Sequence, residues 1–189
     1  MKLHFLGESH AAQHFKLAAT IRGFELTSHL DEADLLFVSE DTPTDNEGRR
    51  DLLPIRKLME IALAYTVPVI LTSQVPPGFS RSYDSQKLYH QSETLRIKDA
   101  LIRAVFPEQI IMGTRGNLKH SAPILWASRF ECPIVWCSYE EAEFSKIAIN
   151  MTLASQVENT NRLAEAAKKV GAEWGNIQRI LAHDKRIGP

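Results

Sequence analysis

Two polar side chains four residues apart are the first candidates for chemistry in this sequence. Lys146 and Asn150 lie in a stretch rich in helix-forming residues, and side chains at this spacing share one face of a helix. An ammonium and an amide side by side suit the stabilisation of a developing oxyanion. The alternative is that Lys146 is a solvated helix residue, because a Lys and an Asn at this spacing are common.

A glycine turn follows the first apolar run. Its sequence is Gly7-Glu8-Ser9-His10-Ala11-Ala12, where a dinucleotide-binding fold carries G-x-G-x-x-G/A. Gly7 is kept, but Ser9 replaces the middle glycine that lets the backbone approach a pyrophosphate, and Glu8 adds negative charge where phosphates would bind. We therefore expect a Rossmann-like scaffold with impaired NAD affinity. Asp31 can reach a ribose from the second strand, although a solvated loop or helix-cap role is the alternative.

The order of elements predicts the scaffold. Apolar runs predict strands at 3–6, 24–27, 35–38, 67–71, 88–90, 109–112 and 134–136, and helical patterns occupy 11–22, 52–65, 139–170 and 173–182. This rhythm indicates an α/β fold with a Rossmann-like, mainly parallel sheet and flanking helices, followed by a long C-terminal helix and a short one. Ser138 and Glu141 form a capping box for the long helix, and Gly171 ends it. We expect a shortened NAD-binding-type domain at 1–138 and an incomplete helical, dimerising segment at 139–189.

Composition excludes several classes of protein. The net charge is −1 and the basic residues are scattered, which gives no argument for nucleic acid or an anionic membrane as a partner. No apolar run approaches the roughly 18 residues of a membrane span, and the opening stretch is too short for a signal peptide. Cys132 and Cys137 lie five apart around a predicted strand, on opposite faces, so we expect neither a disulfide nor a metal site. We expect a cytoplasmic protein.

Four segments resemble one family, the UDP-glucose and GDP-mannose dehydrogenases. Asp41-Thr42-Pro43-Thr44, with Gly48 and Asp51-Leu52, is similar to N-T-P-T…G…D-L, and residues 73–78 are similar to S-T-V-P-P-G. Residues 88–113 resemble N-P-E-F-L-R-E-G…P-D-R-I-V-I-G without a gap after Leu95. Residues 142–150 resemble A-E-x-x-K-x-x-x-N, and 184–188 follow at the family's spacing.

The resemblance implies NAD as cofactor, a nucleotide sugar as substrate and a homodimer through the 139–170 helix. It implies cofactor-binding roles for Gly7, Ser9, Thr42, Pro43, Thr44, Ser73 and Gln74. It implies that Glu93 is a general acid/base and that Lys146 and Asn150 stabilise an oxyanion, with Glu93, Leu95, Lys146 and Asn150 touching the substrate. Gln74 replaces a threonine that positions water, Ile97 and Lys98 replace a Glu and a Gly, and an internal stretch after the second strand is missing.

The family oxidises an alcohol to a carboxylate through a thioester, which needs a thiolate. The resemblance ends before the segment that carries the family's cysteine and its second nucleotide-binding domain, and Cys132 and Cys137 match nothing catalytic. We expect a truncated member that is inactive as an isolated chain unless a separate polypeptide completes its site. The alternatives are a non-catalytic, dimerising nucleotide-binding scaffold and a degenerate gene product.

Overall fold

The computed structural model describes residues 1–116 and 120–187, in which seven strands form one sheet. The order is β2-β1-β3-β4-β5-β6-β7, and all pairs are parallel except β5 with β6. The strands are β1 (Lys2–Leu6), β2 (Glu25–Leu26), β3 (Leu35–Val38), β4 (Val69–Leu71), β5 (Leu88–Gln91), β6 (Ile110–Thr114) and β7 (Ile134–Ser138). The predicted mainly parallel α/β sheet is confirmed.

The edge strand β2 marks where this sheet departs from a full dinucleotide-binding fold. In the common order 3-2-1-4-5-6 a further strand lies outside the second one. Here β2 has two residues, both exposed, and among the described residues no strand pairs with its outer edge. A short polypeptide link containing the 3-10 turn η1 (Leu30–Glu32) leads directly into β3. Within the described residues β2 is therefore the edge of the sheet.

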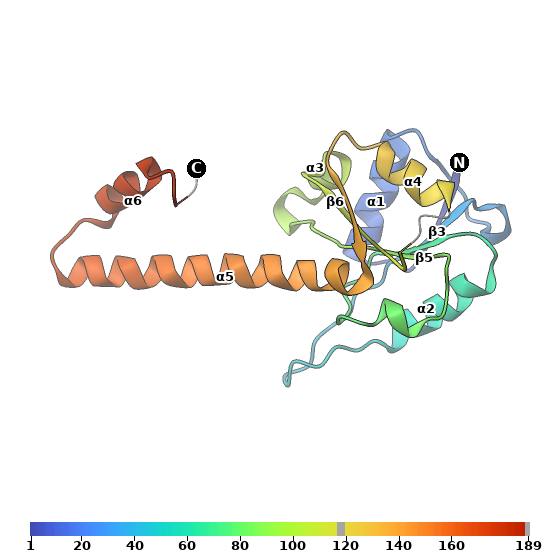
Figure 1. Cartoon of the computed structure of the whole chain (residues 1–189), viewed down its shortest axis with the longest axis horizontal. Helices are drawn as coiled ribbons and strands as arrows, with labels where there is room; N and C mark the ends of the chain where they lie inside the picture. Colours follow the sequence, from blue (N-terminus) through green and yellow to red (C-terminus); the bar gives the residue numbers. More distant parts are fainter. Residues whose placement is uncertain (117–119, 188–189) are drawn as a thin grey trace. The chain divides into compact units, whose positions relative to one another are not determined.

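Helices cover both faces of the sheet. They are α1 (His10–Ile21), α2 (Leu53–Ala64), α3 (Ala100–Val105) and α4 (Ser121–Ser128), with the 3-10 turns η2 (Ser80–Ser82) and η3 (Ile97–Asp99) in the connections. Figure 1 shows α1, α3 and α4 on one face and α2 on the other. Two separate apolar clusters follow from this arrangement, one on each side of the sheet.

The larger cluster is built around Trp126 of α4, which is fully buried. Its ring contacts Phe37 edge-on with centroids 4.8 Å apart, and Phe37 stacks on Phe5 at 4.5 Å. The indole N–H donates to Gln91 Oε1 at 2.7 Å, which satisfies its only polar atom in the interior. On the opposite face α2 buries Ile55 and Met59 against β3 and β4. The four-residue strand β3 is buried along its whole length, as expected of a strand covered on both faces.

The long helix α5 (Tyr139–Lys169) begins and ends at local signals in the sequence. Glu141 accepts from the Ser138 N–H at 2.7 Å, and the Glu141 N–H donates back to Ser138 Oγ at 3.3 Å, so the capping box is confirmed. At the other end Gly171 has φ +74°, and the Ala172 N–H donates to the Ala167 carbonyl at 2.9 Å, the pattern of a Schellman cap. The helix α6 (Trp174–His183) follows.

The chain divides into two compact units, Met1–Lys146 and Ile147–Pro189. The first turns of α5 belong to the first unit, and the domain boundary at 138/139 stays a prediction. Gly188, the last residue of the tail motif, lies outside the described residues. No helix in the described part of the chain combines the length and apolarity that crossing a bilayer requires.

Candidate functional site

A crevice of about 330 Å³ lies where β1, β3 and β4 end. This is the edge at which open parallel sheets bind ligands, because the connections after neighbouring strands meet there. Segments distant in the sequence supply its lining: Ser9 and Ala11, Ser39 to Pro43, Arg50, Thr72 to Gln74, and Glu93. Five predicted cofactor-binding residues are among them: Ser9, Thr42, Pro43, Ser73 and Gln74.

Gly7 and Ser9 hold the turn between β1 and α1 against the end of β3. Gly7 has φ +95°, and a Cβ added there would come within 2.3 Å of the Ser39 carbonyl oxygen, so only glycine fits. The Ser9 hydroxyl accepts from the Ala12 N–H at 3.0 Å and shares a 2.7 Å hydrogen bond with the Ser39 hydroxyl. Ser9 is thus a buried N-cap of α1, and its side chain is fully engaged inside the protein.

Glu40 directs its carboxylate at this turn. Its Oε2 accepts from the Glu8 N–H at 3.4 Å, and its Oε1 accepts from the Asp41 N–H at 3.2 Å. The same Oε2 lies 3.1 Å from an ideal Cβ position on Gly7. A fixed negative charge of the protein therefore stands at the turn that approaches phosphate in dinucleotide-binding folds.

The hydroxyls of Thr42 and Ser73 also bond within the protein. Thr42 Oγ1 donates to the Gln74 carbonyl at 2.7 Å, and Ser73 Oγ accepts from the Glu40 N–H at 2.8 Å. Arg50, the cationic side chain in the crevice lining, donates to the Thr42 carbonyl at 3.1 Å. These bonds join the ends of β3 and β4.

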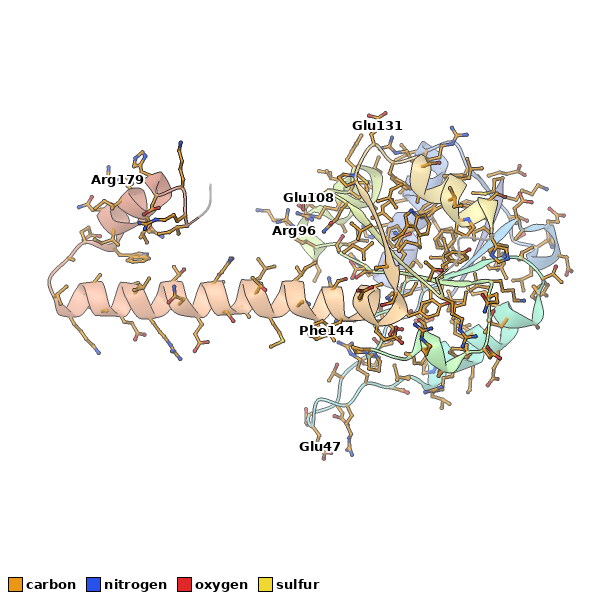
Figure 2. The ribbon with its side chains drawn as sticks, viewed as in Figure 1. Glu47, Arg96, Glu108, Glu131, Phe144 and Arg179 are labelled. Carbon is orange, nitrogen blue, oxygen red and sulfur yellow. The ribbon has the colours of Figure 1, made fainter. Side chains whose placement is uncertain are left out.

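Thr44 and Leu95 lie outside the residues that line the crevice. Thr44 pairs with Arg50 in an isolated antiparallel bridge, at the base of a loop with Glu47 at its tip (Figure 2). The Leu95 side chain packs against the apolar cluster around Trp126.

Glu93 and Lys146, predicted as a catalytic pair, lie together. Lys146 Nζ is 3.5 Å from Glu93 Oε2, and the two side chains are 15% and 20% exposed. Glu93 Oε1 also accepts from the Leu95 N–H. The ion pair is therefore largely shielded from water at the rim of the crevice, where charges interact more strongly than on an open surface. Asn150 follows Lys146 by one turn of α5 and belongs to the second unit.

The sequence analysis did not single out two carboxylates that the structure places in close contact with the backbone, Glu40 and Glu143. Glu143 is 2% exposed and accepts from the Gly78 N–H at 2.6 Å and from the Ser80 N–H at 2.7 Å. It thereby ties α5 to the loop that follows β4. Its signal in the sequence was its place beside Ala142 in the motif that contains Lys146, which by itself does not indicate burial.

Neither cysteine lines the crevice. Both thiols are free, and burial raises the pKa of Cys132 and of Cys137 above the usual range of a thiol. The thiol is therefore the favoured form and not the nucleophilic thiolate. In the described part of the chain no group of three His, Cys, Asp or Glu side chains is placed to hold a metal ion.

The sheet, the glycine turn after β1 and the crevice at the strand ends define a Rossmann-like fold of the kind found in dehydrogenases. Comparison with known proteins identifies the family: residues 140–189 match the model of the UDP-glucose/GDP-mannose dehydrogenase family, central domain. Over these residues the chain is similar to the central domain of that family.

Individual relatives extend the likeness over most of the chain. An uncharacterized protein of Methanocaldococcus jannaschii, MJ1054, is 30% identical over 175 residues, which are 83% of this chain and 19% of that protein. The UDP-glucose 6-dehydrogenase of Streptococcus pneumoniae is 24% identical over 78% of this chain and 42% of its own length. A UDP-glucose dehydrogenase structure from Pyrobaculum islandicum gives a TM-score of 0.80 at 20% identity, covering 99% of this chain and 57% of that one. The chain thus spans less than half the length of these curated relatives.

The residues of the first turn do not fit the NAD that the family implies. The position that a dinucleotide fold leaves open carries Ser9, whose hydroxyl is already bonded to Ser39. Glu40 presents a carboxylate to the turn, and Asp41 and Glu93 add two more carboxylates to the lining. A pyrophosphate placed here would meet like charges, which disfavours its binding.

Proposed function

We propose that this chain is a sugar-nucleotide dehydrogenase-family protein that does not oxidise its substrate on its own. It retains the Glu93–Lys146 pair of the family's site, and in a completed site Glu93 would act as acid/base while Lys146 and Asn150 would stabilise an oxyanion. The observation that supports this most directly is the 3.5 Å pair, brought together from segments more than fifty residues apart in sequence. We also propose a cytoplasmic location, which the two free cysteines support.

The absence of turnover follows from the chemistry of the described crevice. Oxidation of an alcohol to a carboxylate by this route needs a thiolate that attacks an aldehyde carbon. The crevice lining holds hydroxyls, carboxylates, an amide and a guanidinium but no thiol. Lys146 and Glu93 can stabilise charge and move a proton, but neither replaces that nucleophile.

The direct test is an activity assay on the purified chain. The chain is incubated with UDP-glucose and NAD, and NADH is followed by its absorbance. We expect no NADH above the protein-free control. Sustained NADH formation that is lost in the Lys146→Ala variant would overturn the proposal, and loss in Cys132→Ser or Cys137→Ser would then identify the nucleophile.

The second part of the proposal is a homodimer through α5. Phe144 and Met151 are 54% and 63% exposed, and Figure 2 labels Phe144 near the start of the helix. With Ile147 and Ala154 they recur at the spacing of one helix face, a stripe that a helix normally buries.

Sedimentation at micromolar concentration tests the dimer. We expect a dimer for the unmodified chain and a monomer for Met151→Asp, because a carboxylate would then be buried without a partner. Glu158→Gln, an exposed change in the same helix, is the matched control and should remain dimeric. A monomeric unmodified chain contradicts this part of the proposal.

A further inference from the structure

Glu40 has a role that the family resemblance does not assign. We propose that its carboxylate is an internal anion that occupies the phosphate position of the β1–α1 turn and excludes dinucleotides from the crevice. The inference rests on the proposed function for the identity of the crevice, and it goes further by naming the residue that sets its ligand class.

The geometry gives Glu40 the place that a bound phosphate would take. Its Oε2 accepts the Glu8 N–H of the turn at 3.4 Å, and it lies 3.1 Å from where a Gly7 Cβ would be. Dinucleotide folds use the open side of this glycine turn and the following helix N-terminus to hold the pyrophosphate. The Glu40 carboxylate in that position accepts a backbone N–H of the turn, as a phosphate oxygen would, and it carries negative charge, as a phosphate does.

The backbone around Glu40 fixes this position. The Glu40 N–H donates to Ser73 Oγ at 2.8 Å, and the Asp41 N–H donates to Glu40 Oε1 at 3.2 Å. The preceding residue, Ser39, is fully buried and accepts from the Ser9 N–H at 3.4 Å through its carbonyl. Ser39 and Glu40 are thus held by the segments that follow β1 and β4, so the Glu40 side chain starts from an anchored backbone.

The charges nearby do not neutralise this carboxylate. Lys16 of α1 pairs with Glu8 at 3.0 Å, and Arg50 donates to Thr42. Lys146 pairs with Glu93 at 3.5 Å. Lys16 and Lys146 therefore each have a carboxylate partner, whereas the Arg50 guanidinium bonds only to neutral groups. The lining still sets the carboxylates of Glu40, Asp41 and Glu93 against the single guanidinium of Arg50, so its charge stays negative, which selects against diphosphates.

The test compares binding of NADH and of adenosine to three purified proteins by calorimetry. Adenosine presents the nucleoside without phosphate, so it separates charge exclusion from a general change in the crevice. Glu40→Gln removes the charge and keeps the shape. Glu47→Gln removes the same charge from an exposed loop tip and serves as the control. Circular dichroism checks that all three are folded.

We expect Glu40→Gln to bind NADH at least tenfold more tightly than the unmodified chain, with adenosine affinity changed less than threefold and Glu47→Gln unchanged for both. The gain should shrink as salt is raised, because exposed charges are screened. Two results overturn the inference: tight NADH binding by the unmodified chain, or a folded Glu40→Gln that binds NADH no better. Equal gains for adenosine and NADH would also overturn it. Because the readout is binding, these outcomes are independent of whether NADH is produced in the activity assay.

Discussion

Removal of the Glu143 carboxylate is the sharpest test of how the first turns of α5 are held to the rest of the first unit. Glu143 is 2% exposed and accepts two backbone N–H groups, from Gly78 at 2.6 Å and from Ser80 at 2.7 Å. Hydrogen bonds to a charged group contribute roughly 1.5–3 kcal/mol each. Truncation to alanine removes both and leaves the buried Ser80 N–H without this acceptor. We expect Glu143→Ala to lower the free energy of unfolding by about 3–5 kcal/mol.

Two further variants separate the hydrogen bonds from the charge and from the helix. Glu143→Gln keeps one acceptor oxygen, so the loss should be about half as large. Glu140→Ala removes a carboxylate one turn earlier, which pairs with Arg81 while both side chains are more than 40% exposed. An exposed pair of this kind contributes at most about 1 kcal/mol. Glu140 is therefore the matched control for any general effect on α5.

The assay is urea unfolding followed by tryptophan fluorescence. Trp126 reports on the first unit because it is fully buried there, and Trp174→Phe removes the signal from α6. Hydrogen exchange of the Gly78 and Ser80 amides provides a local readout that should speed up in Glu143→Ala. The reasoning is refuted if Glu143→Ala loses no more stability than Glu140→Ala and the two amides remain equally protected.

Two other predictions follow from single residues. Burial lowers the pKa of His90 to about 4 from its ordinary 6.5, so the unfolded chain binds the proton more readily than the folded one. The free energy of unfolding should therefore fall by about 3 kcal/mol as the pH drops from 6.5 toward 4. Urea unfolding at several pH values should show this decline, and His90→Gln should flatten it. Gly7→Ala should cost about 3 kcal/mol or more, since a Cβ would lie 2.3 Å from the Ser39 carbonyl oxygen. Gly23 has φ +80° and no heavy atom near an added Cβ, so Gly23→Ala measures only the cost of a left-handed backbone conformation, about 1–2 kcal/mol. Equal losses of stability for the two glycine variants would contradict the steric argument.

Much of the fold was predictable because its signals are local. The strand at 35–38 was placed with its final bounds, since four consecutive apolar residues lie between polar segments. The start of α5 was predicted from Ser138 and Glu141, whose capping hydrogen bonds span three residues. The convergence of Ser9, Thr42 and Ser73 also followed from the sequence, because the ends of parallel strands meet at one edge of a sheet.

What the sequence did not reveal depends on partners distant in the chain. Glu143 meets the Ser80 N–H across 63 residues, and Glu40 meets the Glu8 N–H across 32. The pattern of neighbouring residues does not show that these two carboxylates bond to distant backbone groups, because an acidic residue in a helix or after a strand is usually exposed to solvent. Leu95 packs against the apolar cluster around Trp126, a contact that depends on how the connection after β5 folds back. Its predicted contact with substrate stays a prediction.

The contacts of the first turns of α5 explain how the Glu93–Lys146 pair forms. Glu143 binds the loop after β4, Ser145 Oγ lies 3.0 Å from Ser92 Oγ, and Ala142 packs so closely on Gly113 that a Cβ there would approach to 2.8 Å. These contacts fix the start of the helix against β6, the residue after β5 and the loop after β4 through protein groups alone. Lys146 is therefore held near Glu93 by the fold itself, and the pair requires neither bound cofactor nor substrate to form. The Glu93–Lys146 pair and the Glu40 carboxylate are held by separate contacts, so the presence of the pair is compatible with the proposed exclusion of dinucleotides.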